Sequence, residues 1–236
     1  MSTVFGGPVQ LEPDITMDVR SRLSPAADME RVSRQLCLMQ PGHVGSMRVF
    51  RPLPTAAFAP RDLSLAGYAV AAKRLCEDGF TPVERRTGGQ LAVYDDTALI
   101  IDLVVAHPQP RLDVIERFRS FAAAICSALA GFGIDAGVGP VPGEYCPGEY
   151  SVNAGGLRKI AGLAQRIVRC GYHLGAVIAV EPSPRVQAAT ARAYDALGLH
   201  LNATSFGAAV DSGKTVGFVD LRDALVGEML RRIEVI

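Results

Sequence analysis

Apolar residues recur at the spacing of an α-helix in five stretches of the chain. The first begins at Ser24 and Pro25, a hydroxyl cap followed by proline at the first helical position, and continues through Met39. The other four stretches have the same period: Tyr68–Cys76, Leu112–Leu129, Pro184–Leu197 and Asp220–Ile233. We therefore expect five helices.

Short β-rich runs lie between these stretches: Met47–Phe50, Val83–Arg86, Leu91–Tyr94, Leu99–Val105, Tyr150–Asn153, Leu163–Val168 and Leu174–Val180. Gly-Gly and Asp-Asp separate the second, third and fourth runs, which is typical of a meander. We expect a proline-punctuated loop up to Pro60 and another loop from Gly137 to Gly148. Helices separated by hairpin-linked strands predict an α+β fold with a mostly antiparallel sheet flanked by helices.

Composition limits the classes of protein to consider. With 236 residues, 49% of them hydrophobic, the chain can form one large domain over 1–236. Lys and Arg balance Asp and Glu at 24 each, so no net charge favours nucleic acid or an anionic membrane. Its apolar runs are shorter than the roughly 20 residues of a membrane helix. The five cysteines form no C-x-x-C pair and no signal peptide is visible, so we expect reduced thiols in the cytoplasm. The four histidines lack metal-ligand spacing, and we predict no metal site.

One candidate for ligand binding is the segment from Glu84 to Gly89. Two arginines end a predicted strand and run into Thr87 and the pair Gly88-Gly89. Glycines let backbone N–H groups approach an anionic ligand, and arginine provides a rigid fork for carboxylate or phosphate. The alternative is an ordinary hairpin turn flanked by solvated arginines.

A second candidate is the segment from Tyr150 to Gln165, in which a turn delivers Lys159 into a strand between small residues. Small neighbours leave room for a ligand, and a lysine that faces such a space needs a negative charge to anchor it. The alternative is an exposed strand lysine.

Four motifs occur in order along the chain: Arg85 to Gly89, Ala92-Val93-Tyr94 with Asp96, Arg158 to Gln165, and His173 before the run Leu174–Val180. This order resembles the lipoate–protein ligases and the related octanoyltransferases, which share a catalytic domain with biotin–protein ligases. The resemblance spans roughly Met47 to Val180, and the pattern from Pro142 to Asn153 is similar to an actinobacterial branch. Biotin ligases instead carry an arginine-glycine loop and usually a tryptophan, and this chain has no Trp.

The resemblance implies an α+β catalytic domain like that of the biotin and lipoate protein ligases, and a ligase reaction. ATP, with Mg²⁺, activates lipoate or octanoate as an acyl-adenylate, and a lysine of a lipoyl carrier domain or a glycine-cleavage H-type protein then accepts the acyl group. Both steps develop negative charge beside the carboxyl carbon, a charge that Lys159 is expected to stabilise. The expected substrate and nucleotide site comprises Arg86, Thr87, Gly88, Gly89, Ala92, Val93, Tyr94, Ile160, Ala161, Gly162 and His173.

Several departures from the family pattern open a second hypothesis. The first motif has two glycines where three are typical, and Asp95 stands where histidine is usual. We see no separate C-terminal accessory domain of the kind that many ligases use during adenylation. Either a separate accessory polypeptide supplies it, or the protein does not adenylate.

The alternative is an ATP-independent octanoyl or lipoyl transferase that carries the acyl group as a thioester on Cys146. This cysteine lies in the loop before Lys159, as the nucleophile does in one group of octanoyltransferases, with slightly shorter spacing. A third possibility is a non-catalytic relative that binds the acyl group. In each case Arg86–Gly89 and Lys159 should line one apolar cavity, with Val93, Ile160 and Ala161 in its wall. Asp96 and His173 are expected near its rim or beneath it.

Overall fold

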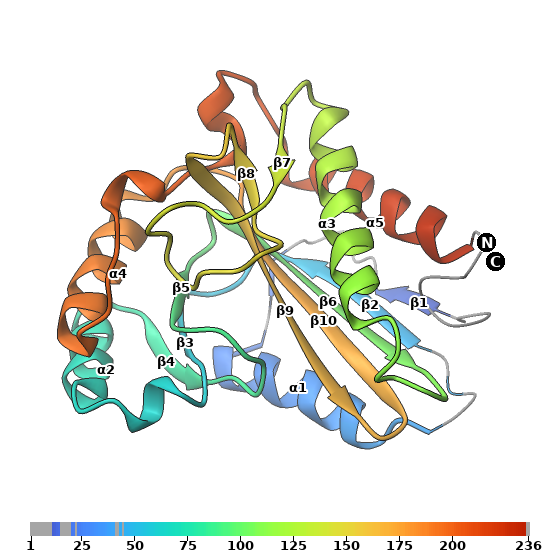
Figure 1. Cartoon of the computed structure of the whole chain (residues 1–236), viewed down its shortest axis with the longest axis horizontal. Coiled ribbons are helices and arrows are strands. Elements are labelled where there is room, and N and C mark those ends of the chain that lie inside the picture. The colour runs from blue at the N-terminus through green and yellow to red at the C-terminus, as the bar shows by residue number, and fades with distance from the viewer. Residues whose placement is uncertain (1–10, 15–19, 22, 41–42, 44, 235–236) are drawn as a thin grey trace.

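The computed structural model describes residues 11–14, 20–21, 23–40, 43 and 45–234, and these form two sheets and five α-helices (Figure 1). The larger sheet has seven strands in the order β1-β2-β6-β10-β9-β8-β7. Their bounds, in that order, are Leu11–Asp14, Gly45–Phe50, Ala98–Ala106, Gly171–Ala179, Arg158–Val168, Val152–Ala154 and Gly137–Val138. Every pairing in this sheet is antiparallel except that of β1 with β2. The expected α+β fold is confirmed.

The smaller sheet has the order β4-β3-β5, and its central strand corrects one prediction. Residues Thr55–Phe58, expected to be loop, form β3 and pair with β4 (Thr81–Glu84) and β5 (Ala92–Tyr94). The expected meander is also wrong, because β4 and β5 both pair with β3 and not with each other, while β6 joins the larger sheet. All four residues of β3 are buried, so the strand lacks the alternation of a half-exposed one.

The five helices lie where their periodicity predicted, with each end within two residues of the prediction. They are α1 Pro25–Cys37, α2 Tyr68–Glu77, α3 Val114–Ala130, α4 Pro184–Leu197 and α5 Phe218–Glu234. Hydroxyl caps begin two of them, since Ser24 accepts the Ala27 N–H and Ser183 accepts the Val186 N–H. Both caps precede a proline, as the sequence predicted for α1.

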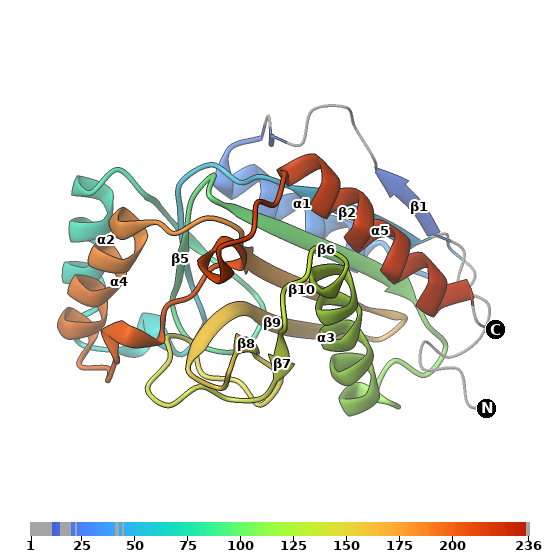
Figure 2. The same ribbon diagram turned by 90° about the horizontal axis from the view of Figure 1, so that it is seen from above.

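Two helical layers cover different parts of the sheets. Helices α2 and α4 lie side by side at one end of the molecule and pack on the smaller sheet, whereas α3 and α5 lie at the other end and pack on the larger sheet (Figures 1 and 2). The opposite face of the larger sheet contacts α1. A third apolar cluster, which includes Phe50, Ala57, Tyr94 and Ile100, joins this face to the smaller sheet. The space bounded by α1 and the two sheets is therefore walled on three sides.

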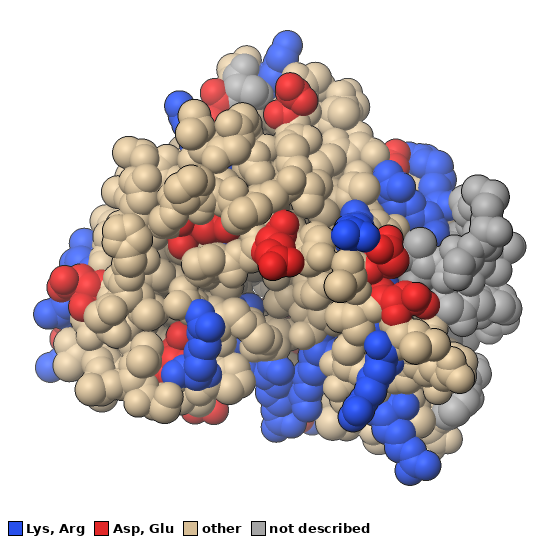
Figure 3. All heavy atoms as spheres, viewed as in Figure 1, with Lys and Arg blue, Asp and Glu red and all other residues tan. Residues whose placement is uncertain are grey.

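The surface shown in Figure 3 carries acidic and basic side chains interspersed, in keeping with the equal numbers of the two kinds. None of the helices in the described residues is long and apolar enough to cross a membrane.

Candidate functional site

A cavity of about 110 Å³ occupies the space between α1 and the two sheets. Its walls are mostly apolar, with Met29 and Leu36 from α1, and Ile100 and Val177 from the larger sheet. Nine of the residues that the sequence singled out line this cavity. They are Arg85, Arg86, Thr87, Ala92, Tyr94, Cys146, Lys159, Gly162 and His173. The two candidate segments, about seventy residues apart in sequence, therefore meet at one cavity.

Three residues expected in the cavity wall lie elsewhere. Val93 packs in the core beneath α2 and α4, and Ile160 and Ala161 pack in the core beneath α3 and α5. For Val93 the reason is that neighbouring residues of a strand point to opposite faces of the sheet, so Ala92 and Tyr94 reach the cavity and Val93 does not. The positions of Val93, Ile160 and Ala161 in the wall are thus corrected.

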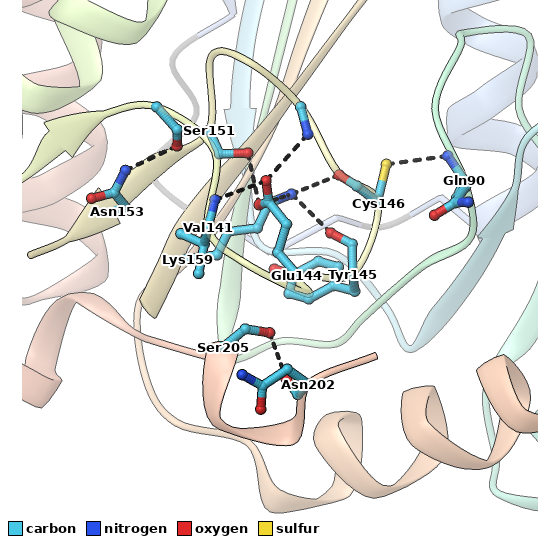
Figure 4. A network of polar contacts seen from close by, with 12 residues as sticks. Gln90, Val141, Glu144, Tyr145, Cys146, Ser151, Asn153, Lys159, Asn202 and Ser205 are labelled. Carbon is cyan, nitrogen blue, oxygen red and sulfur yellow. Dashed lines mark hydrogen bonds and ion pairs between the residues drawn. The ribbon is translucent and has the colours of Figure 1, made fainter. Parts of the chain in front are cut away.

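Lys159 is buried, with 1% of its surface exposed, and its ammonium group has three acceptors (Figure 4). Its Nζ lies 2.9 Å from Glu144 Oε2, 2.9 Å from the Tyr145 carbonyl oxygen and 2.8 Å from the Cys146 carbonyl oxygen. An ammonium has three N–H donors, so these contacts use all of them. The negative charge that the sequence required is present, and Glu144 supplies it.

Glu144 is equally well satisfied, because the loop that carries it folds around its carboxylate. Oε1 accepts the backbone N–H groups of Val141 and Gly148, both at 3.2 Å, and Oε2 accepts the Ser151 hydroxyl at 2.8 Å. A buried carboxylate with these donors and a lysine partner is stable as an ion pair. The pair therefore ties the 141–151 loop to β9.

Cys146 lies in this loop with a left-handed backbone, φ +43°, which is uncommon for a residue other than glycine. Its Sγ accepts hydrogen bonds from Arg85 Nη2 and from the Gln90 backbone N–H, both at 3.3 Å. Two donors, one of them charged, therefore converge on the sulfur. Cys146 also lines the cavity, so its side chain borders the space that a ligand in the cavity would occupy.

Tyr194 of α4 connects the loop that carries Cys146 with the segment that ends at Leu91. Its hydroxyl accepts the Cys146 N–H at 2.7 Å and donates to the Leu91 carbonyl at 2.9 Å. Burial, with a smaller contribution from the neighbouring Cys146, raises the pKa of Tyr194. The hydroxyl therefore stays protonated and keeps its donor.

Gly89 lies against the thiol, while Gly88 does not. A Cβ atom at Gly89 would be 2.7 Å from Cys146 Sγ and 2.8 Å from Arg85 Nη2, and the residue has φ +100°. A Cβ at Gly88 would have no neighbour within 4 Å. Of the two glycines, only Gly89 is required by the local geometry.

The remaining polar groups of the cavity are on the larger sheet. His173 Nε2 lies 2.9 Å from Asp102 Oδ1, and both residues line the cavity. Asp96, expected near the rim of the cavity or beneath it, does not line the cavity and is a surface partner of Arg51, at 3.6 Å. His173 is therefore part of the cavity wall, and Asp96 is not.

A second, smaller cavity lies on the far side of Tyr145, and its chemistry differs. Asp95 and Glu181 line it, and no Lys or Arg does so among the residues that the structure describes. The Asp95 carboxylate accepts hydrogen bonds from Thr97 and Ser183. Within the described part of the chain, no group of three or more His, Cys, Asp or Glu side chains could hold a metal ion.

Four functional candidates were not identified from the sequence: Asp102, Glu144, Tyr194 and the guanidinium of Arg85 as a partner of the thiol. Glu144 belongs to the Pro142–Asn153 pattern, so that pattern was its signal. Asp102 and Tyr194 reach the site through sheet register and helix packing, for which the sequence offers no local signal.

Comparison with known proteins gives one matching family model. It describes the catalytic domain of lipoyl protein ligases A and B and matches residues 67–198, which is more than half of the chain. The matched range contains Arg85, Cys146, Lys159 and His173.

Several curated relatives carry the name octanoyl-[GcvH]:protein N-octanoyltransferase. One from Geobacillus kaustophilus is 29% identical over 152 residues, which cover 64% of this chain and 53% of the relative. Another from Exiguobacterium sibiricum is 32% identical over 128 residues, which cover 54% and 46% of the two chains. The chain thus spans about half the length of the curated relatives it matches.

Two solved structures with the same fold are named as a putative lipoate protein ligase and as a lipoate-protein ligase A. A Thermoplasma acidophilum protein with bound lipoic acid has a TM-score of 0.70 and 18% identity, covering 96% of this chain and 86% of its own. A lipoate-protein ligase A bound with ATP has a TM-score of 0.68 and 18% identity, covering 95% and 83%. At this identity the likeness shows a shared fold.

Proposed function

Because the chain belongs to the lipoyl protein ligase A/B catalytic domain family, we propose that it transfers a medium-chain acyl group between carrier proteins through a thioester on Cys146. The observation that carries this proposal is the thiol of Cys146, held at the wall of an apolar cavity by two hydrogen-bond donors. The names of the curated relatives support the same reaction class. Our first hypothesis from the sequence, the ATP-dependent ligase, is the competing function.

The contacts of Lys159 favour transfer over ligation. In the ligase reaction its ammonium must contact the acyl carboxylate and the α-phosphate, but here all three N–H donors already have acceptors within 2.9 Å. Moving Glu144 away would leave a buried carboxylate without its counter-ion, which costs several kcal/mol. In the thioester route Lys159 needs no such change, because it holds the carbonyl groups of the loop that presents Cys146.

The second cavity gives little support for a nucleotide. Asp95 and Glu181 line it, and no Lys or Arg does so among the described residues, so this cavity supplies no side-chain cation to the phosphates of a nucleotide. The thioester route itself needs no nucleotide, because the acyl group arrives already attached to a carrier protein.

The transfer proceeds in two steps without ATP. The Cys146 thiolate attacks the acyl carbonyl of the donor amide, an S–C bond forms, the C–N bond breaks, and the carrier amine leaves with a proton taken from solvent. The amine of an acceptor lysine then attacks the thioester, a C–N bond forms, the C–S bond breaks, and the amine's proton returns to solvent as the thiolate is restored. The Arg85 guanidinium and the Gln90 N–H stabilise the sulfur when it carries negative charge.

The proposed donor and acceptor follow from the relatives. Their name specifies an octanoyl group on the glycine cleavage H protein and a second protein that accepts it on nitrogen. We propose the same class for this chain, an octanoyl-loaded H-type protein as donor and a lipoyl carrier domain as acceptor.

Transfer from octanoyl-loaded H protein to an apo lipoyl domain, without ATP, tests this function. Wild type and the Cys76→Ala control, which changes an exposed cysteine on α2, should both transfer. Cys146→Ala should lose about two orders of magnitude or more of turnover. A protein that releases pyrophosphate from ATP and octanoate, and keeps its activity after Cys146→Ala, would be the ligase.

A further inference from the structure

The cavity between α1 and the two sheets has a polar wall along β9 and β10, away from Lys159. Gly162 lies beside Lys159, and Arg166 is four residues further along β9. At about 3.3 Å per strand residue these two positions are about 13 Å apart. Arg166 pairs with His173 across the sheet, so the two side chains leave the same face as neighbours.

His173 has one ring nitrogen engaged and one available. Nε2 lies 2.9 Å from Asp102 Oδ1, and Nδ1 has no hydrogen-bond partner among the residues that the structure describes. In the neutral ring Nε2 donates to the carboxylate, which leaves Nδ1 as an acceptor. Gly175 makes this arrangement possible, because a Cβ there would lie 3.0 Å from the His173 ring.

Arg166 supplies a donor to the same wall. It lines the cavity, and its Nη1 is buried without a hydrogen-bond partner in the described structure. A buried guanidinium N–H that has lost water and gained no acceptor costs free energy, so a ligand acceptor placed there stabilises the complex.

Groups of both charges line this end of the cavity. Asp28, which also lines the cavity, is paired with Arg48, and Asp102 is paired with His173. The Arg166 guanidinium and the Asp102 carboxylate both line the cavity. A ligand carboxylate would meet the like charge of Asp102 and a ligand ammonium that of Arg166, whereas a neutral group that both donates and accepts suits both.

Resting on the acyl-transfer function above, we propose that His173, Asp102 and Arg166 form a polar subsite for the distal end of the acyl chain. The subsite takes a chain of about eight carbons with a neutral hydrogen-bonding group, such as a hydroxyl, at or near its last carbon. The hydroxyl donates to His173 Nδ1 and accepts from Arg166 Nη1. Bonds of about 1.5 Å let such a chain cover most of the span from Lys159 when extended.

Isothermal titration of the protein with free octanoate and with 8-hydroxyoctanoate tests this subsite without requiring transfer. Wild type should bind the hydroxylated acid about tenfold more tightly, the gain from satisfying a buried charged donor. Arg166→Met keeps an apolar stem but removes the donor, and should bring the two affinities close to parity. Arg169→Met, at an exposed position of the same hairpin, should keep the wild-type ratio.

Equal affinities of wild type for the two acids would overturn the subsite, and this comparison stands even where Arg166→Met fails to fold. A ratio unchanged in folded Arg166→Met would overturn it as well. Octanoyl transfer is measured separately, so a lost preference with intact transfer removes only the subsite. Preferential binding of the hydroxylated acid by a protein that transfers nothing keeps the subsite and removes the transferase.

Discussion

Replacing Glu144 by glutamine should destabilise the protein strongly, because it leaves the Lys159 ammonium buried without a counter-ion. Both side chains are 1% exposed and lie 2.9 Å apart. Glutamine has nearly the same shape, yet its NH₂ group would face the N–H groups that now donate to the carboxylate. Breaking a buried pair from one side costs about 3–5 kcal/mol.

That magnitude is measurable by urea denaturation and by thermal unfolding followed by circular dichroism. For a chain of this size 1 kcal/mol corresponds to about 2–4 °C in Tm, so Glu144→Gln should unfold about 6–20 °C below wild type. Glu149→Gln is the matched control, since Glu149 is exposed in the same loop and its change should stay within about 0.5 kcal/mol. Equal midpoints for the Glu144 and Glu149 variants would refute the role of the ion pair.

A double-mutant cycle separates the pair from its surroundings. Lys159→Met alone leaves the Glu144 carboxylate buried and should be as harmful as Glu144→Gln. Combining the two changes removes both charges, so the combined loss should be clearly smaller than the sum of the single losses. Additive losses would show that the two groups act independently.

The remaining predictions concern the thiol site and the fold. Gly89→Ala should lower transfer at least tenfold, because its Cβ would meet Cys146 Sγ at 2.7 Å, while Gly88→Ala should transfer at the wild-type rate. Tyr194→Phe should cost about 1–3 kcal/mol in urea denaturation and lower kcat, because it removes two buried hydrogen bonds, and unchanged values would contradict this. Burial, with a smaller contribution from a nearby arginine, lowers the pKa of His107 below 6.5. As the pH falls, the His107 imidazole is therefore protonated at a higher pH in the unfolded chain than in the folded one. Stability should therefore be full above about pH 6.5 and fall as the pH drops, and His107→Phe should flatten that fall in denaturation curves at a series of pH values.

The sequence was most informative about the fold where the signal is local. Ser24 with Pro25 predicted the start of α1, and the helical periods located all five helices, because caps and amphipathic faces are encoded within a few residues. Strand β3 was missed because Thr55–Phe58 is buried on both faces, short and flanked by prolines. The meander was wrong because pairing between β3, β4 and β5 depends on contacts distant in sequence.

At the candidate site, too, features encoded locally could be predicted and contacts between distant residues could not. Lys159 and its need for a negative partner could be predicted from the small residues around it, and Glu144 meets that need. Asp102 could not be predicted, because its approach to His173 depends on the register of β6 and β10. Val93 was misplaced by one position, since adjacent strand residues face opposite sides and the phase of a three-residue strand is not encoded locally.

A thioester on Cys146 should be directly observable by mass spectrometry of the intact protein and of its peptides. The protein is mixed with a stoichiometric amount of octanoyl-loaded H protein, without ATP, quenched in acid and digested. We predict an octanoyl group on the peptide that contains Cys146, which disappears when an apo lipoyl domain is added before the quench. An unmodified Cys146, with octanoyl-adenylate formed only when ATP and octanoate are supplied, would contradict the thioester mechanism.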